Sequence, residues 1–221
     1  MGSDPGEGAT DEEPEQVAFL SAYCMDLLEV TNDAYRACEV AGACAAHLGP
    51  YGPDGHPVGN VGWSQATAYC AWLGKRLPTE AEWEKAARGG CEIAAPESCG
   101  EEDERTYPWG DTAPTCLLAN YDTCVGGTEP VGSHPDGRSP YGISDLAGNI
   151  WEFVSDFLGA SYSSCGFPCV DPYGPATGSA HVIRGGQWSS DAAGLRVADR
   201  DGVAGDTSTR PDLGFRCASS L

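Results

Sequence analysis

The chain has 221 residues, of which 33 are acidic and 12 are basic, and its formal net charge at pH 7 is −21. This charge repels phosphate backbones and anionic lipid headgroups, so neither a nucleic acid nor a membrane surface is an expected partner. No apolar run approaches the length of a membrane-spanning helix, which excludes membrane insertion as well.

The first two predicted helices are short and have clear end signals. One covers residues 33–40, where small apolar residues recur at helical spacing. The other covers residues 64–73, with Ser64 as its N-cap and Gly74 in the left-handed position past its end. Trp72 is expected to face the core from this second helix.

The third predicted helix follows Thr79, and Glu82 three residues later completes a capping box. Trp83 shares its apolar face with two alanines, and glycines at 89–90 stop it. Beyond this helix, turns dominate in a chain of 30 glycines and 16 prolines. Short strands are expected at 109–111, 130–132, 182–186 and 213–216. These elements predict an α+β fold of low regular content, in a single domain over residues 1–221.

The eleven cysteines indicate an oxidising compartment. Four close pairs bracket turn-rich loops and are predicted disulfides: Cys38 with Cys44, Cys91 with Cys99, Cys116 with Cys124, and Cys165 with Cys169. Irregular spacings and only four histidines argue against zinc. We therefore expect an extracytoplasmic protein (secreted, periplasmic or surface-anchored) whose signal segment has been removed. The odd count leaves one thiol unpaired, and Cys24, expected to be free and buried, is the candidate.

Several motifs follow one another in a fixed order. Residues 74–84 read Gly-Lys-Arg-Leu-Pro-Thr-Glu-Ala-Glu-Trp-Glu, 107–111 read Tyr-Pro-Trp-Gly-Asp, 142–153 read Gly-Ile-Ser-Asp-Leu-Ala-Gly-Asn-Ile-Trp-Glu-Phe, 184–188 read Arg-Gly-Gly-Gln-Trp, and 213–217 read Leu-Gly-Phe-Arg-Cys. With the segments at 1–3, 11–14 and 29–32, they resemble the formylglycine-generating enzyme, or sulfatase-modifying factor, family over essentially the whole chain. The resemblance implies that family's variant of the C-type lectin fold and a disulfide between Cys70 and Cys217.

The resemblance also implies a structural calcium site at residues 145–152. Carried over to this chain, its ligands are the side chains of Asp145 and Glu152 and the carbonyls of Gly148 and Ile150. Such oxygen ligands are those that Ca²⁺ prefers. Alternatively, Asp145 caps a turn and Glu152 accepts hydrogen bonds from backbone amides. A second family site would use Asn120 and the carbonyl of Tyr121, but the matching carboxylate is missing there.

Active members of the family oxidise a sulfatase cysteine to formylglycine, using O₂ and a copper ion held by two cysteines that follow the Arg-Gly-Gly motif. Here the first of these positions is Ser190, and the second falls near Ala192 or in a gap. Neither side chain can replace the thiolates that Cu(I) needs. No cysteine lies between Cys169 and Cys217. Copper is therefore not expected, and no catalytic residue is assigned.

The stretch 188–210 borders the ligand face of this fold. It offers an aromatic platform, an acceptor and two cations, namely Trp188, Asp191, Arg196 and Arg200. Alternatively, the two arginines bridge carboxylates of neighbouring loops. The sequence favours a non-catalytic extracytoplasmic binding domain on a calcium-stabilised scaffold, with a peptide, protein or glycan as ligand. A copper- and O₂-dependent oxidoreductase is the alternative, and a structural accessory module of a larger secreted protein is a third hypothesis.

Overall fold

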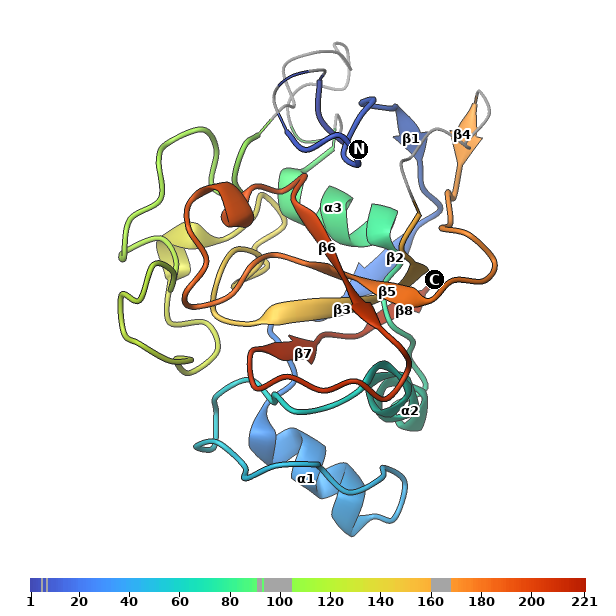
Figure 1. The fold of residues 1–221 in the computed structure, drawn as a ribbon, viewed down its shortest axis with the longest axis vertical. Helices are drawn as coiled ribbons and strands as arrows, with labels where there is room; N and C mark the ends of the chain where they lie inside the picture. Colours follow the sequence, from blue (N-terminus) through green and yellow to red (C-terminus); the bar gives the residue numbers. More distant parts are fainter. Residues whose placement is uncertain (5, 7, 91–92, 94–104, 160–167) are drawn as a thin grey trace.

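A four-stranded sheet with the order β6-β5-β3-β7 forms the centre of the computed structural model, which describes residues 1–4, 6, 8–90, 93, 105–159 and 168–221 (Figure 1). Its strands are β3 (Trp151–Phe157), β5 (Ala180–Arg184), β6 (Arg200–Ala204) and β7 (Leu213–Phe215). β3 pairs antiparallel with β5 and parallel with β7, and β5 pairs antiparallel with β6.

Helices cover both faces of this sheet. Successive strand residues point to opposite sides, so each face carries its own set of apolar side chains that a helix can bury. Val154 and Val182 pack with α3 (Glu80–Arg88) on one face. Phe153 and Ile183 pack with α1 (Asn32–Val40) and α2 (Trp63–Trp72) on the other. Figure 1 shows α3 above the sheet and the other two helices below it. The predicted α+β class is confirmed.

Two small sheets and two short 3₁₀ helices complete the described elements. β1 (Ala18–Phe19) pairs parallel with β4 (Cys169–Val170), and β2 (Tyr23–Met25) pairs antiparallel with β8 (Ala218–Ser220). The 3₁₀ helices are η2 (Pro135–Gly137) and η3 (Ala193–Leu195). None of the helices in the described part of the chain has the length and apolar character to cross a membrane.

The helix predictions are confirmed in place, with two corrections in α2. Its N-cap is Gly62, whose backbone N–H donates to the Gln65 side chain, while Ser64 lies inside the helix and donates its hydroxyl to a distant carbonyl. Trp72 is 41% exposed, so the expectation that it faces the core is wrong. The residues that α2 buries are Ala66, Tyr69 and Cys70.

Of the predicted strands, 182–186 and 213–216 correspond to β5 and β7. The segment 109–111 contributes only an isolated bridge between Tyr107 and Gly110, and 130–132 forms no strand. Both segments are turns instead, because each contains or adjoins a proline and a glycine, at 108 and 110 and at 130 and 132.

Three predicted disulfides are present: Cys38–Cys44, Cys70–Cys217 and Cys116–Cys124. Cys169 is also disulfide-bonded, whereas its predicted partner Cys165 and the predicted pair Cys91–Cys99 lie outside the described residues. Cys24 is free, as expected, but it is exposed. The expectation of burial is wrong because Cys24 points to the opposite side of β2 from Met25, which packs on the core.

Candidate ligand face and calcium turn

Helix α3 holds the C-terminal strands through its glutamates. Arg200 of β6 donates two hydrogen bonds of 2.8 Å to the carboxylate of Glu80. Arg184 of β5 donates a 2.6 Å hydrogen bond to Glu84, four residues later on the same helix face. Arg200 is only 8% exposed, so its guanidinium is part of the interior.

Arg196 is bound in the same way by the N-terminal segment. It donates hydrogen bonds of 2.9 and 2.6 Å to the two carboxylate oxygens of Glu12, which also accepts from Ser3. Burial raises the pKa of Glu12, but the hydrogen bonds from Arg196 and Ser3 outweigh it and hold the pKa below its usual value. Arg196 and Arg200 thus bridge carboxylates of the chain itself. A ligand role for them stays a prediction, and it requires these ion pairs to open.

Residues 187–194, which include the predicted position of the first copper cysteine, form a closed turn. The backbone N–H of Gln187 donates to the Ser190 hydroxyl over 3.0 Å, and Ser190 N donates back to Gln187 O over 2.8 Å. The Asp191 carboxylate accepts from Ala193 N and Gly194 N, both at 3.1 Å, at the start of η3. The Asp191 carboxylate is thus engaged by two backbone N–H groups of its own turn, and a ligand role for it stays a prediction.

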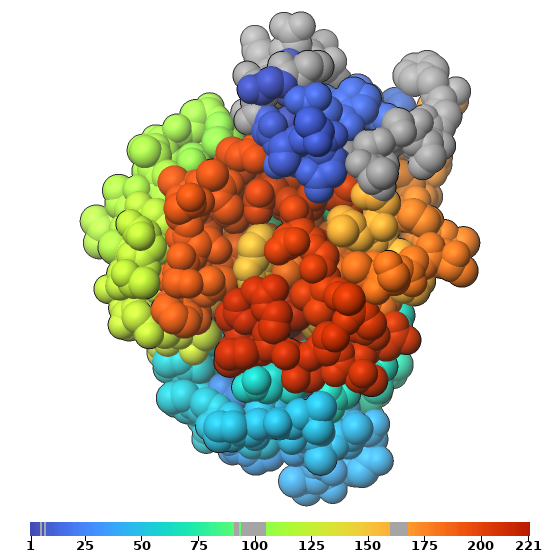
Figure 2. Space-filling view, viewed as in Figure 1, coloured from blue at the N-terminus to red at the C-terminus, as the bar shows by residue number. Residues whose placement is uncertain are grey.

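A second loop lies against this turn and positions Trp188. Thr123 N donates to Trp188 O over 3.0 Å, and Asp122 N donates to Ser190 O over 2.9 Å. Asp122 and Thr123 both have positive φ, at 44° and 58°. This conformation is a genuine outlier for a β-branched residue such as threonine. The disulfide that closes this loop, Cys116–Cys124, holds the strained pair in place. Figure 2 shows the two segments side by side on one face of the molecule.

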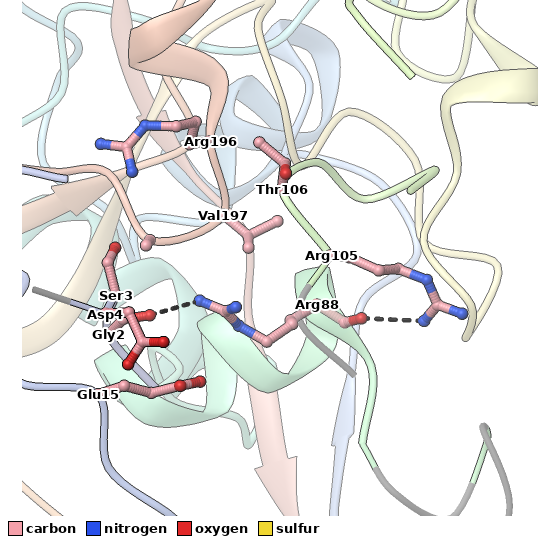
Figure 3. A pocket seen from close by; sticks show the side chains of 10 residues that line it. Gly2, Ser3, Asp4, Glu15, Arg88, Arg105, Thr106, Arg196 and Val197 are labelled. Carbon is pink, nitrogen blue, oxygen red and sulfur yellow. Dashed lines mark hydrogen bonds between the residues drawn. The ribbon is translucent and has the colours of Figure 1, made fainter. Parts of the chain in front are cut away.

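A cavity of about 330 Å³ borders Arg196 (Figure 3). Two further arginines line it: Arg88, which donates to Gly2 O over 2.7 Å, and Arg105, which donates to Arg88 O over 3.0 Å. Among the described residues of its lining, Asp4 and Glu15 are acidic. The cavity thus offers both donors and acceptors beside the predicted ligand face.

The predicted calcium turn at residues 145–152 has a left-handed backbone at several positions, including Gly148. Asp145, Gly148 and Asn149 have φ values of 59°, 85° and 61°. A Cβ on Gly148 would lie 2.3 Å from Asn120 O, so only glycine fits there. This close approach brings together the predicted ligands of both family calcium sites.

The carboxylates of the turn are buried and already accept hydrogen bonds. Asp145 accepts from Gly132 N over 2.5 Å. Glu152 accepts from Arg216 through two hydrogen bonds of 2.8 and 2.6 Å, and from Trp83 Nε1 over 2.8 Å. The predicted alternative, in which Glu152 accepts hydrogen bonds from backbone amides, is therefore wrong, because its donors are the side chains of Arg216 and Trp83.

Two buried oxygens near the turn have no hydrogen-bond partner, Glu29 Oε1 and Asn120 Oδ1. Asn149 links the two residues, donating to Glu29 over 2.8 Å and accepting from Asn120 over 3.3 Å. Burial raises the pKa of Glu29 well above its usual value, and the nearby Asp145 and Glu152 carboxylates raise it further. Partnerless oxygens among crowded carboxylates fit a hard cation such as Ca²⁺. No three His, Cys, Asp or Glu side chains of the described ranges converge as a metal-binding group, so carbonyl and amide oxygens would complete its shell.

Sequence reasoning did not single out Glu29 or Glu12. Their partners are 120 and 184 residues away, at Asn149 and Arg196, so no local pattern marks them. The one signal is that each stands in a segment, 29–32 or 11–14, that the resemblance includes.

Comparisons with known proteins agree with the motifs. The model of the "Sulfatase-modifying factor enzyme 1-like domain" family matches residues 1–221. The formylglycine-generating enzyme of Streptomyces coelicolor is 42% identical over 185 residues, which cover 76% of this chain and 54% of that protein. The "Inactive C-alpha-formylglycine-generating enzyme 2" of Mus musculus is 38% identical over 170 residues, which cover 74% of this chain and 49% of that protein. The chain thus spans about half the length of these relatives.

Among solved structures, Treponema denticola variable protein 1 has a TM-score of 0.78 to this structure and 26% sequence identity. The match covers 100% of this chain and 91% of that one. The two proteins therefore share one fold over the whole length of this chain.

Proposed function

The chain belongs to the sulfatase-modifying factor enzyme 1-like family, and we propose that it is a non-catalytic, extracytoplasmic binding domain on that family's scaffold. Its ligand would be a peptide, a protein or a glycan, bound at the face that carries Trp188. The observation that carries the proposal is the turn at Ser190, where a hydroxyl stands in place of a copper-binding thiol.

The Ser190 hydroxyl has a structural task, because it accepts the Gln187 N–H and closes the turn. Cys24 is the free thiol among the described cysteines, and it lies on β2 rather than beside Ser190. A single thiol cannot supply the two sulfur ligands of a Cu(I) site. The mouse relative that is named inactive supports the idea that members of this family can lack the enzymatic activity.

The strained loop at Asp122 and Thr123 supports a recognition role for the neighbouring face, because backbone strain concentrates at functional sites. The Cys116–Cys124 disulfide and the two hydrogen bonds to Trp188 and Ser190 hold this face rigid. A preformed face loses little conformational entropy when it binds a ligand.

We further propose that Ca²⁺ stabilises this scaffold at the turn. The residues that would hold it are Asp145 and the carbonyls of Gly148 and Ile150, as predicted. The orphaned oxygen of Glu29 would take the place of the predicted ligand Glu152, which is bound by Arg216 and Trp83. When bound, the ion supplies positive charge among buried carboxylates. The Asn120 oxygen is free for the second family site, where Asp122 is the nearest carboxylate in the sequence.

The main proposal is tested by assaying the protein for the family's reaction, the oxidation of a peptide cysteine to formylglycine. Copper-loaded protein is incubated in air with a peptide that has a Cys-x-Pro-x-Arg core, and the product is analysed by mass spectrometry. We expect no aldehyde product from the wild type or from Cys24→Ser. The Streptomyces coelicolor enzyme serves as the positive control. Aldehyde formation by the wild type would overturn the proposal in favour of the oxidoreductase.

A further inference from the structure

Strand β6 is an edge strand of the central sheet, since β5 is its one neighbour in the sheets of the described residues. At the end of the β5–β6 pairing, Gly205 N donates to Ser179 O over 3.1 Å. On the other side of β5, Leu158 N donates to Ala180 O over 2.8 Å. Backbone groups of successive residues point to opposite sides of a strand, so those of Ser179 face β6 and those of Ala180 face β3.

The register of the two strands carries this alternation into β6. Val203 and Asp201 lie opposite the two β5 residues whose backbone groups face β6, so their own backbone groups face β5. The N–H and C=O groups of Gly202 and Ala204 therefore point the other way, toward the edge of the sheet. Asp201 and Ala204 are both exposed, so this part of the edge borders solvent.

Two side chains cap this edge by hydrogen-bonding its outward backbone groups. Gly202 N donates to the Asp201 carboxylate over 2.7 Å, and Ala204 O accepts from the Ser208 hydroxyl. Ser208 stands just past the turn that follows β6. An added antiparallel strand would bond both the N–H and the C=O of each outward residue. Because one of the two groups is already engaged at Gly202 and one at Ala204, such a strand would find half of these bonds taken.

We propose that Asp201 and Ser208 protect the edge of the central sheet and thereby keep the protein from pairing with a second copy of itself through β6. An unprotected edge strand is a template for pairing with another chain, and charged side chains on the edge oppose this. Asp201 acts in both ways, since its carboxylate engages the Gly202 N–H and its negative charge repels the same edge of a second copy. This protection shares no residue with the turn at Trp188, so it does not depend on the function proposed above.

The bond between Asp201 and Gly202 can be tested by amide hydrogen exchange, followed residue by residue with NMR. Asp201→Ala removes the acceptor, so exchange of the Gly202 N–H should speed up at least about tenfold, which corresponds to about 1.4 kcal/mol. Asp201→Asn keeps an acceptor oxygen without the charge, and its Gly202 exchange should stay within about threefold of the wild type.

Asp136→Ala is the matched control for the exchange measurement. Asp136 is also exposed and also precedes a glycine, but Gly137 N donates to the backbone oxygen of His134 instead. The variant should therefore leave the exchange of both the Gly137 and the Gly202 amides unchanged.

Sedimentation velocity tests the protection against association. The double variant Asp201→Ala/Ser208→Ala lacks both caps, and we expect it to form a larger species than the wild type, in a fraction that rises with concentration. Each single variant should do the same at higher concentration, so the test does not depend on the double variant. Circular dichroism establishes that each variant is folded.

A third substitution shows whether the copies meet at β6. Ala204→Pro, added to the double variant, removes the outward N–H of residue 204 but spares the pairing with β5, because this N–H faces away from β5. It should restore the sedimentation of the wild type.

Three results would overturn the proposal. Gly202 exchange that does not change in Asp201→Ala would show that the carboxylate does not hold this N–H. Folded single and double variants that sediment like the wild type would show that the two side chains do not control association. Association that persists after Ala204→Pro would place the contact between copies on another surface.

Discussion

Arg216 and Glu152 are both inaccessible to solvent and are joined by two hydrogen bonds. Removing one member of a buried pair leaves the other charge without compensation, which costs about 3–5 kcal/mol. We expect Glu152→Gln to lower the free energy of unfolding by this amount in urea titrations. The control is Asp54→Asn, which removes the exposed pair between Asp54 and Arg36 and should cost under about 1 kcal/mol. Equal effects would contradict the structural role of Glu152.

Asp199 predicts a pH dependence of stability. Burial raises its pKa from 3.8 to about 6, although Arg184 and Arg196 lower it. The folded carboxyl thus binds its proton more tightly than the unfolded one, so its contribution falls as the pH rises from about 4 to about 6. Asp199→Asn should remove this loss, at most about 3 kcal/mol at pH 7. Urea titrations at pH 4 and pH 7 measure it, and equal pH dependence in both proteins would contradict it.

At the residue scale, the role of a side chain could be predicted where a local motif fixes its position. It could not be predicted where the role depends on a contact between residues that are far apart in the sequence. The motif at 184–188 is enough to predict that Ser190 stands at the family's first copper-ligand position. The pairing of Arg196 with Glu12 could not be predicted, because 184 residues separate them and arginines on loops resemble ligand-binding cations in any sequence. The same holds for Glu29.

At the scale of elements, α3 begins with the capping box that its sequence predicts. Thr79 Oγ1 accepts from Glu82 N over 3.1 Å, and the Glu82 carboxylate accepts from Thr79 N over 2.8 Å. We expect Thr79→Ala to lower the free energy of unfolding by about 1 kcal/mol in urea titrations. Thr31→Ala at the N-cap of α1 is the comparison, since its cap bond is longer, at 3.4 Å, and the loss should be smaller. A larger loss of unfolding free energy for Thr31→Ala than for Thr79→Ala would contradict this interpretation of the two caps.

Helices could be predicted better than strands because their signals are local. In α3, for example, the N-cap Thr79 and the terminating Gly89 belong to one short segment of the sequence. The central strand β3 is buried on both faces for most of its length and therefore shows no polar alternation. Short edge strands such as β1 and β2 have two or three residues, too few for a periodicity.

At the scale of the whole molecule, the proposed calcium turn joins the two halves of the chain, since Glu29 and Asn149 meet there. A ligand that binds only the folded state stabilises it by about 2.7 kcal/mol at a hundredfold excess over Kd. For a chain of this size that raises Tm by roughly 5–10 °C. We expect EGTA to remove this increment in calorimetry and Ca²⁺, but not Mg²⁺, to restore it. Asp145→Asn should reduce the Ca²⁺ response, and a Tm independent of Ca²⁺ would contradict the site.

The bonds between α3 and the C-terminal strands also set the order in which this protein can mature. A nascent chain that ends at residue 180 has already formed the sequence of α3, yet it lacks the arginines of β5 and β6 that bind Glu80 and Glu84. Its Cys70 thiol cannot yet form the native disulfide, because Cys217 lies 147 residues later in the chain. Strand β2 likewise lacks its partner strand β8. These native contacts can therefore form only after the segment that carries β8 has been synthesised, so the domain folds late relative to its own synthesis.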